Sequence, residues 1–269
     1  MKSFLKELEI AIRLVKASER ITLKYFGTKF RIDLKADLSP VTIADRNCEK
    51  FLVTELSKRF PDHGFFGEEF GERLGKSSNP QDMTSGHEQH AVDRWIIDPI
   101  DGTRNFTRGL PYWGTLCGLE HYGEMVLGVM SLPALKKIYY ATRRHGAFCN
   151  GKRIRVSRIG ELDKSTVVFG GLSHFVGSKH ESGFVDIVKS SYHDRGFGDC
   201  FGYTFVADGQ AEVMLDPIVS PWDVAAIKPI IEEAGGAFSD FEGNSTIYGR
   251  TGLASNGFLH ETILKKLAR

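Results

Sequence analysis

The most constraining feature of the chain is an apolar run that ends in two aspartates three positions apart. This segment, residues 95–106, reads WIIDPIDGTRNF. The apolar residues predict a buried strand, and Pro99 fixes a turn after Asp98, so that Asp101 can reach the same point. Gly102 and Thr103 then offer unhindered backbone N–H groups where a helix or turn begins. The segment therefore predicts two carboxylates beside an anion-binding turn.

Two carboxylates beside such a turn repel both each other and a phosphate. A hard divalent metal ion removes this conflict, because it binds carboxylate and phosphate oxygens together. The alternative is a surface turn of the form Asp-Pro-x-Asp-Gly, in which the aspartates only cap the turn and accept local hydrogen bonds. The segment alone leaves both interpretations open.

Further carboxylates stand at the ends of other predicted elements. Glu68 and Glu69 follow the apolar pair Phe65-Phe66, and Asp223 lies in the first turn of a predicted helix. Each has an ordinary explanation, since paired glutamates are common on surfaces and aspartate is a favoured helix cap. In combination with the two aspartates of the first segment, they favour a metal cluster, because functional groups concentrate at the ends of elements.

Helical spacing of apolar residues predicts a long first helix, from Leu5 towards Tyr25, and a second helix that Thr42 caps and that ends near Pro61. Short apolar runs from Trp95 to Cys149 predict an antiparallel sheet. Helices and strands alternate after that sheet, which indicates a layered sandwich without internal repeats. The later predictions are a strand over 167–169, a helix over 202–207, a strand over 211–215 and a helix over 222–234 ended by Gly235-Gly236.

Composition excludes several kinds of partner. Lys plus Arg total 35 and Asp plus Glu total 34, so no basic field is available to hold nucleic acid. No segment approaches the roughly 18 apolar residues of a membrane span. The four cysteines lie far apart without metal-binding spacing, which is typical of free thiols in a reducing compartment. We expect a cytoplasmic protein that binds neither nucleic acid nor membranes.

The chain resembles the inositol monophosphatase superfamily. Four motifs carry the resemblance in the family's order and approximate spacing: Lys35-Ala36-Asp37-Leu38-Ser39-Pro40-Val41-Thr42-Ile43-Ala44-Asp45, Gly67-Glu68-Glu69, Asp98-Pro99-Ile100-Asp101-Gly102-Thr103 and Trp222-Asp223-Val224-Ala225-Ala226. The resemblance implies an α+β fold, a five-layer α-β-α-β-α sandwich. Residues 1–269 would form one catalytic unit, with a metal-binding half over about 1–150 and a substrate-recognition half over about 151–269. A homodimer is a further expectation.

The resemblance also implies hydrolysis of a small phosphate monoester with up to three Mg²⁺ ions per active site. The implied metal ligands are Glu68, Asp98, the carbonyl of Ile100, Asp101 and Asp223. Thr103 with Asp45 would orient and deprotonate the attacking water, and Gly102 with Thr103 would bind the phosphate. Glu69 would orient a ligand or water without binding metal itself. Lys35 would offset the carboxylate charge, with a solvated lysine as the alternative.

Substrate choice has to come from the second half of the chain. The segments Gly198-Asp199-Cys200-Phe201-Gly202-Tyr203 and Gly67-Glu68-Glu69-Phe70-Gly71 look like the bacterial histidinol-phosphate phosphatase branch. Asp199 and Asp216 could accept hydrogen bonds from the ammonium and imidazole groups of that substrate, with Arg195 also near it. Trp222-Asp223 departs from the branch, which often has Tyr-Asp there. In the alternative, Asp199 is a turn residue and Asp216 pairs with Arg195.

The first functional hypothesis is therefore hydrolysis of L-histidinol phosphate to L-histidinol and phosphate, a step of histidine biosynthesis. The second is an inositol-1-phosphate phosphatase with the same machinery. A third, of a different class, is a non-catalytic relative that binds phosphorylated ligands. Such a relative would have lost at least one functional side chain, and none of the five at Glu68, Asp98, Asp101, Thr103 and Asp223 is lost.

Overall fold

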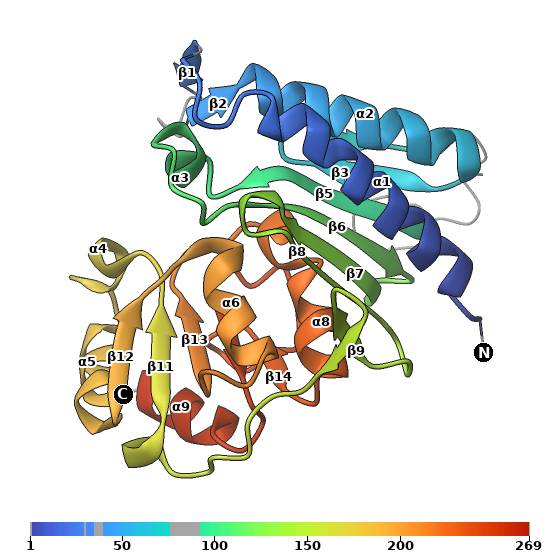
Figure 1. The fold of residues 1–269 in the computed structure, drawn as a ribbon. Helices are drawn as coiled ribbons and strands as arrows, with labels where there is room; N and C mark the ends of the chain where they lie inside the picture. Colours follow the sequence, from blue (N-terminus) through green and yellow to red (C-terminus); the bar gives the residue numbers. More distant parts are fainter. Residues whose placement is uncertain (1, 30, 35–39, 76–91, 269) are drawn as a thin grey trace.

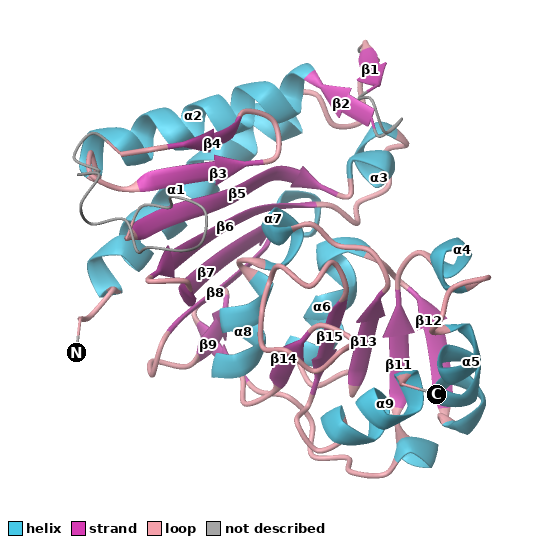
Figure 2. Cartoon of the chain, turned by 180° about the vertical axis from the view of Figure 1, so that it is seen from behind, coloured by secondary structure: helices cyan, strands magenta, loops and turns pink. Residues whose placement is uncertain are grey.

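The computed structural model describes residues 2–29, 31–34, 40–75 and 92–268. Its helices and sheets alternate in five layers, α-β-α-β-α, as the sequence predicted (Figures 1 and 2). No helix within these ranges is long and apolar enough to cross a membrane. Lys35 lies outside the described residues, so its predicted role has no structural counterpart here.

The first helical layer covers the outer face of the larger sheet. Its two members are α1 (Leu5–Leu23) and α2 (Ile43–Arg59). Their apolar faces share one hydrophobic core with the sheet, in which Leu14 and Leu52 pack together with Trp95. Thr42 caps α2 with its side chain, as predicted. A short ribbon of β1 (Ile32–Leu34) and β2 (Pro40–Thr42) leads into this helix.

The larger sheet has eight strands in the order β10-β9-β8-β7-β6-β5-β3-β4. The strands are β3 (Gly64–Gly67), β4 (Gly71–Arg73), β5 (Asp93–Asp101), β6 (Gly114–His121), β7 (Glu124–Leu132), β8 (Lys137–Thr142), β9 (Ala147–Cys149) and β10 (Lys152–Ile154). Neighbours are antiparallel, as predicted, except that β3 runs parallel to β5. Parallel pairing brings the carboxyl ends of β3 and β5 to the same edge.

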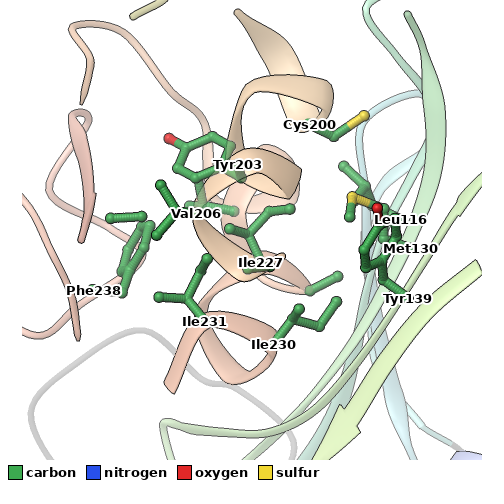
Figure 3. Close-up of a cluster of buried hydrophobic side chains, with 14 of the residues drawn as sticks. Leu116, Met130, Tyr139, Cys200, Tyr203, Val206, Ile227, Ile230, Ile231 and Phe238 are labelled. Atoms are coloured by element: carbon green, nitrogen blue, oxygen red, sulfur yellow. The ribbon is translucent and has the colours of Figure 1, made fainter. Parts of the chain in front are cut away.

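The middle layer lies between the two sheets and consists of α6 (Asp199–Ala207), α7 (Pro221–Val224) and α8 (Ile227–Glu233). Figure 3 shows its side chains, such as Tyr203 and Ile227, in one buried cluster with Leu116 and Met130 of the larger sheet. Small residues allow the layers to approach closely. A Cβ on Gly128 of β7 would lie 2.1 Å from the carbonyl oxygen of Ala226.

The smaller sheet has the order β12-β11-β13-β15-β14 and carries the fifth layer on its outer face. Its strands are β11 (Thr166–Phe169), β12 (His193–Gly196), β13 (Val213–Asp216), β14 (Ala237–Ser239) and β15 (Gly252–Ser255). The outer helices are α5 (Glu181–Ser190) and α9 (His260–Leu267), which share a separate core with this sheet. Two short α-helices, α3 (Thr103–Thr107) and α4 (Leu172–Phe175), and two 3-10 helices, η1 (Pro133–Leu135) and η2 (Leu162–Lys164), complete the described elements.

The predicted helix over 222–234 is wrong in one respect, because it divides into α7 and α8. Pro229 explains the division, since proline has no N–H to donate to the carbonyl of Ala225 four residues earlier. The helix predicted over 202–207 is confirmed and begins earlier, at Asp199. The short α7 that results presents its first turn to the carboxyl end of β5, as described below.

Candidate metal centre

Three aspartates from two distant parts of the chain meet at one point. Asp98 and Asp101 lie at the end of β5, and Asp223 lies on α7. Each offers one carboxylate oxygen, and these oxygens all lie within 4.8 Å of one another. Asp98 and Asp101 are only 1% and 7% exposed. Asp223 is half-buried, so the cluster is a largely buried group of like charges.

The end of β5 is shaped by a break in its pairing with β6. The register shifts between Asp98 and Asp101, so both side chains can face the cluster. Asp98 Oδ1 accepts the N–H of Ile100 at 3.0 Å, and the Thr103 hydroxyl donates to the carbonyl of Ile100 at 2.9 Å. The local bonds of a simple Asp-Pro turn are thus present, but the turn is buried. A surface turn does not account for that burial.

Asp223 is fixed by a capping box at the start of α7. Its Oδ2 accepts the N–H of Ser220 at 2.7 Å, as expected for a carboxylate in a first helical turn. The neighbouring Trp222 ring meets the Phe66 ring edge-on, with centroids 5.3 Å apart. This contact fastens α7 to β3, next to β5. The cap and the ring contact together place Asp223 over the strand end.

Glu68 follows β3 and lies beside the three aspartates. Its N–H donates to the carbonyl of Ile97 at 3.2 Å, which anchors it to β5. After burial, the charge of Glu68 is the strongest influence that raises the pKa of Asp98, and the two side chains share a hydrogen bond. The structure therefore brings together all four carboxylates that the sequence singled out.

Burial and mutual repulsion dominate the electrostatics of the cluster. Burial raises the pKa values of Asp98 and Asp101 well above the usual range, and neighbouring carboxylates raise them further. Burial also raises the pKa of Asp223, to about 7. No lysine, arginine or histidine within the described ranges forms an ion pair with these three side chains. An all-oxygen, negatively charged donor set without a partner cation fits a hard divalent metal such as Mg²⁺.

Asp45 adds an unsatisfied oxygen near this centre. Its Oδ2 accepts the N–H of Thr42 at 2.8 Å and the Thr42 hydroxyl at 2.5 Å, whereas its Oδ1 is buried without a hydrogen-bond partner among the described residues. The pKa of Asp45 is raised to about 7, mainly by burial and also by the charges of Glu69 and Glu68, although the hydrogen bonds from Thr42 oppose the increase. A buried oxygen of this kind ordinarily requires a partner such as water. Thr103 begins α3, which contacts β2, the strand before Asp45.

The predicted substrate residues Asp199 and Asp216 lie close to the cluster. Asp199 Oδ2 accepts a hydrogen bond from Asn105 Nδ2 at 2.9 Å. Burial raises the pKa of Asp199, and the charge of Arg104 opposes this increase. Burial likewise raises the pKa of Asp216, with further contributions from Asp199 and then Asp223. The four acids Asp101, Asp199, Asp216 and Asp223 therefore form one electrostatic neighbourhood.

Arg195 does not join this group through an ion pair in the described part of the chain. Its side chain is exposed on β12, and its Nη1 donates to the backbone carbonyl of Asp194 at 2.6 Å. The local partner of Asp216 is the backbone N–H of Ile218. The structure thus gives no pairing between Asp216 and Arg195.

The sequence predictions missed two groups at this centre. Asn105 donates a hydrogen bond to Asp199. This role was missed, although Asn105 lies within the segment that was singled out, because the sequence gives no sign of a contact across 94 positions. Glu49 accepts the backbone N–H groups of Glu69 and Phe70 at 2.9 and 3.1 Å. Its position four residues after Asp45 on the predicted helix was the one available signal, since such residues share a helix face.

The structure is thus a layered sandwich with an acid cluster at the edge of its larger sheet, and comparison with known proteins gives its family. The inositol monophosphatase family model matches residues 5–269. A histidinol-phosphatase of Chlorobaculum parvum is 42% identical over 93% of this chain and 91% of its own length. An inositol-1-monophosphatase of Mesorhizobium japonicum is 32% identical over 97% of this chain and 96% of its own length.

A solved structure has the same fold. The extragenic suppressor protein suhB of Bartonella henselae matches with a TM-score of 0.87 and 27% sequence identity, covering 98% of this chain and 99% of that chain. The chain belongs to the inositol monophosphatase family, and it is a phosphatase of that family.

The raised pKa of Asp223 predicts how stability depends on pH without metal. Its folded-state pKa of about 7 exceeds the ordinary 3.8. The folded state therefore binds the proton more tightly, and stability is lost as pH rises from about 4 to about 7. In EDTA, Asp223→Asn should raise the melting temperature more at pH 8 than at pH 5, as measured by differential scanning fluorimetry. Asp163→Asn removes an exposed carboxylate and should show no such difference. Equal shifts for Asp223→Asn at both pH values would contradict the raised pKa of Asp223.

Proposed function

We propose that the protein is a Mg²⁺-dependent phosphomonoesterase that hydrolyses its substrate with an activated water molecule. The observation that carries the proposal is the buried cluster of Asp98, Asp101 and Asp223, with oxygens within 4.8 Å of one another. These three side chains, with Glu68 and the carbonyl of Ile100, would hold up to three Mg²⁺ ions. When bound, Mg²⁺ would lower the pKa of water and neutralise charge on the phosphoryl group.

The chain's own groups would orient the water and the phosphate. Thr103 and Asp45 would hold the attacking water and take its proton, for which the unsatisfied Asp45 Oδ1 is suited. Glu69 would orient a neighbouring ligand or water. The backbone N–H groups of Gly102 and Thr103 would bind the phosphate at the turn before α3. Gly102 has φ +79°, and a Cβ there would lie 3.2 Å from Asp199 Oδ2, so a side chain would strain this turn.

L-histidinol phosphate is the substrate that the surroundings of the cluster favour. Its ammonium group and titratable imidazole are cationic or hydrogen-bond donors, and Asp199 and Asp216 supply two carboxylates beside the metal cluster. A histidinol-phosphatase is 42% identical to this chain, whereas the inositol-1-monophosphatase described above is 32% identical. The product alcohol would be L-histidinol, released with inorganic phosphate.

Inositol-1-phosphate is the second candidate, because the same metal machinery serves both esters and Trp222 is the form usual in inositol phosphatases. A non-catalytic relative is disfavoured, since every side chain of the proposed machinery is present. We retain two expectations about organisation: recognition of the alcohol by the half over about 151–269, and a homodimer. Size-exclusion chromatography with light scattering would test the second.

Removal of one charge from the cluster should abolish turnover without unfolding the protein. Asp98→Asn changes little volume and replaces an anionic donor with a neutral one, so kcat should fall by about 10³-fold or more in Mg²⁺. Phosphate release and far-UV circular dichroism measure the two effects. Asp163→Asn serves as the matched control. Near wild-type turnover by Asp98→Asn would show that the proposed metal site is wrong.

The substrate assignment predicts a selective effect at Asp199. This residue has φ +55°, a conformation that asparagine tolerates, so Asp199→Asn removes the charge without adding backbone strain. The kcat/KM of this variant should fall about tenfold or more for L-histidinol phosphate, because a charged hydrogen bond to that substrate is lost. For inositol-1-phosphate it should fall by less than about threefold. Adenosine 3′,5′-bisphosphate should be the poorest of the three for the wild-type enzyme. Equal losses on the first two substrates would make Asp199 structural.

A further inference from the structure

The turn between β3 and β4 is held by a buried carboxylate on α2. Glu49 is only 1% exposed. Its Oε2 accepts the N–H of Glu69 at 2.9 Å, and its Oε1 accepts the N–H of Phe70 at 3.1 Å. Both oxygens are thus engaged by the backbone of the turn that carries Glu68. One residue on α2 therefore fixes two consecutive peptide groups of that turn.

Gly67 leaves the space that the Glu49 carboxylate occupies beside the turn. A Cβ at this position would overlap Glu49 Oε1, so a side chain here would displace that carboxylate. Gly67 is not in the left-handed region, so it is required for space and not for an unusual conformation. Glu68 itself donates its N–H to Ile97 on β5. The turn is therefore anchored to β5 by one bond and to α2 by two.

The burial of a charged carboxylate at this turn carries a free-energy penalty. Glu49 lies beside the charges of Glu69 and Glu68, and it has no ion pair within the described ranges. A neutral side chain could satisfy one N–H group without the penalty of a buried charge. The Glu49 carboxylate accepts the two N–H groups with separate oxygens, and it also adds negative charge next to the acid cluster. The penalty of burying the Glu49 charge therefore suggests that this carboxylate has a role at the acid cluster.

We propose that Glu49 is a positioning residue of the metal centre. It holds the turn so that the Glu68 side chain faces Asp98, and it acts through Glu68 without binding metal itself. Asp45 lies one helical turn earlier, so α2 supports the centre at two successive turns. The proposal rests on the proposed metal-dependent function, and the experiment below separates the failure of one from the failure of the other.

The test compares three variants by thermal shift during titration with MgCl₂, a readout that does not require turnover. Glu49→Gln keeps the size and one acceptor, whereas Glu49→Asp keeps the charge but is too short to reach the turn. Each should raise the Mg²⁺ concentration for half-maximal stabilisation about tenfold. Glu55→Gln removes a half-buried glutamate of the same helix, which pairs with Lys58 and Arg59 away from the turn, and should leave this Mg²⁺ concentration unchanged. At saturating Mg²⁺, kcat of Glu49→Gln should fall about tenfold with KM within about twofold.

Wild-type Mg²⁺ affinity in both Glu49 variants would overturn the proposal. Wild-type affinity in Glu49→Asp alone would also overturn it, because the effect would then come from charge and not from the hydrogen bonds. If the wild-type protein itself shows no stabilisation by MgCl₂, the proposed metal-dependent function fails first. Circular dichroism of each variant before titration ensures that only folded protein is compared.

Discussion

The burial of several like-charged carboxylates at one point is the constraint on which the rest of the structure depends. Asp98 and Asp101 are buried and Asp223 is half-buried, so the three carboxylates repel one another with little screening by water, and burial raises the pKa of each. Folding alone gains nothing from such an arrangement. A cation of two positive charges changes the balance, because it converts the repulsion into coordination. If the proposed cation binds there, the stability of the acid cluster will depend on that cation.

The sheets and helices around this cluster hold the carboxylates in place against their mutual repulsion. The pairing between β5 and β6 is interrupted only at the strand end, where Asp98 and Asp101 must face the same way. Hydrophobic cores between neighbouring layers pack the five layers together. Carboxylates from β5, the β3–β4 turn and α7 can then be held together, because the larger sheet fixes the first two and the middle layer fixes the third.

The sequence predicts the parts of the centre that lie next to residues typical of the ends of helices and strands. Apolar residues before Asp98 and proline before Trp222-Asp223 mark element ends, and the acids follow directly. Contacts between distant residues leave no such mark, so the bond from Asn105 to Asp199 was not predictable. Glu49 was missed because the position of a glutamate within a predicted helix does not show whether its side chain is buried or exposed. The division of α7 from α8 was different, since the position of Pro229 could have predicted it.

Binding of a divalent cation by the acid cluster is tested most directly by crystallography of the wild-type protein soaked in MnCl₂. Mn²⁺ prefers the same oxygen ligands as Mg²⁺ and scatters anomalously. An anomalous peak coordinated by carboxylates of Asp98, Asp101 and Asp223 is the predicted result. A fully soaked crystal with no peak at these residues, or with peaks only elsewhere, would contradict the account.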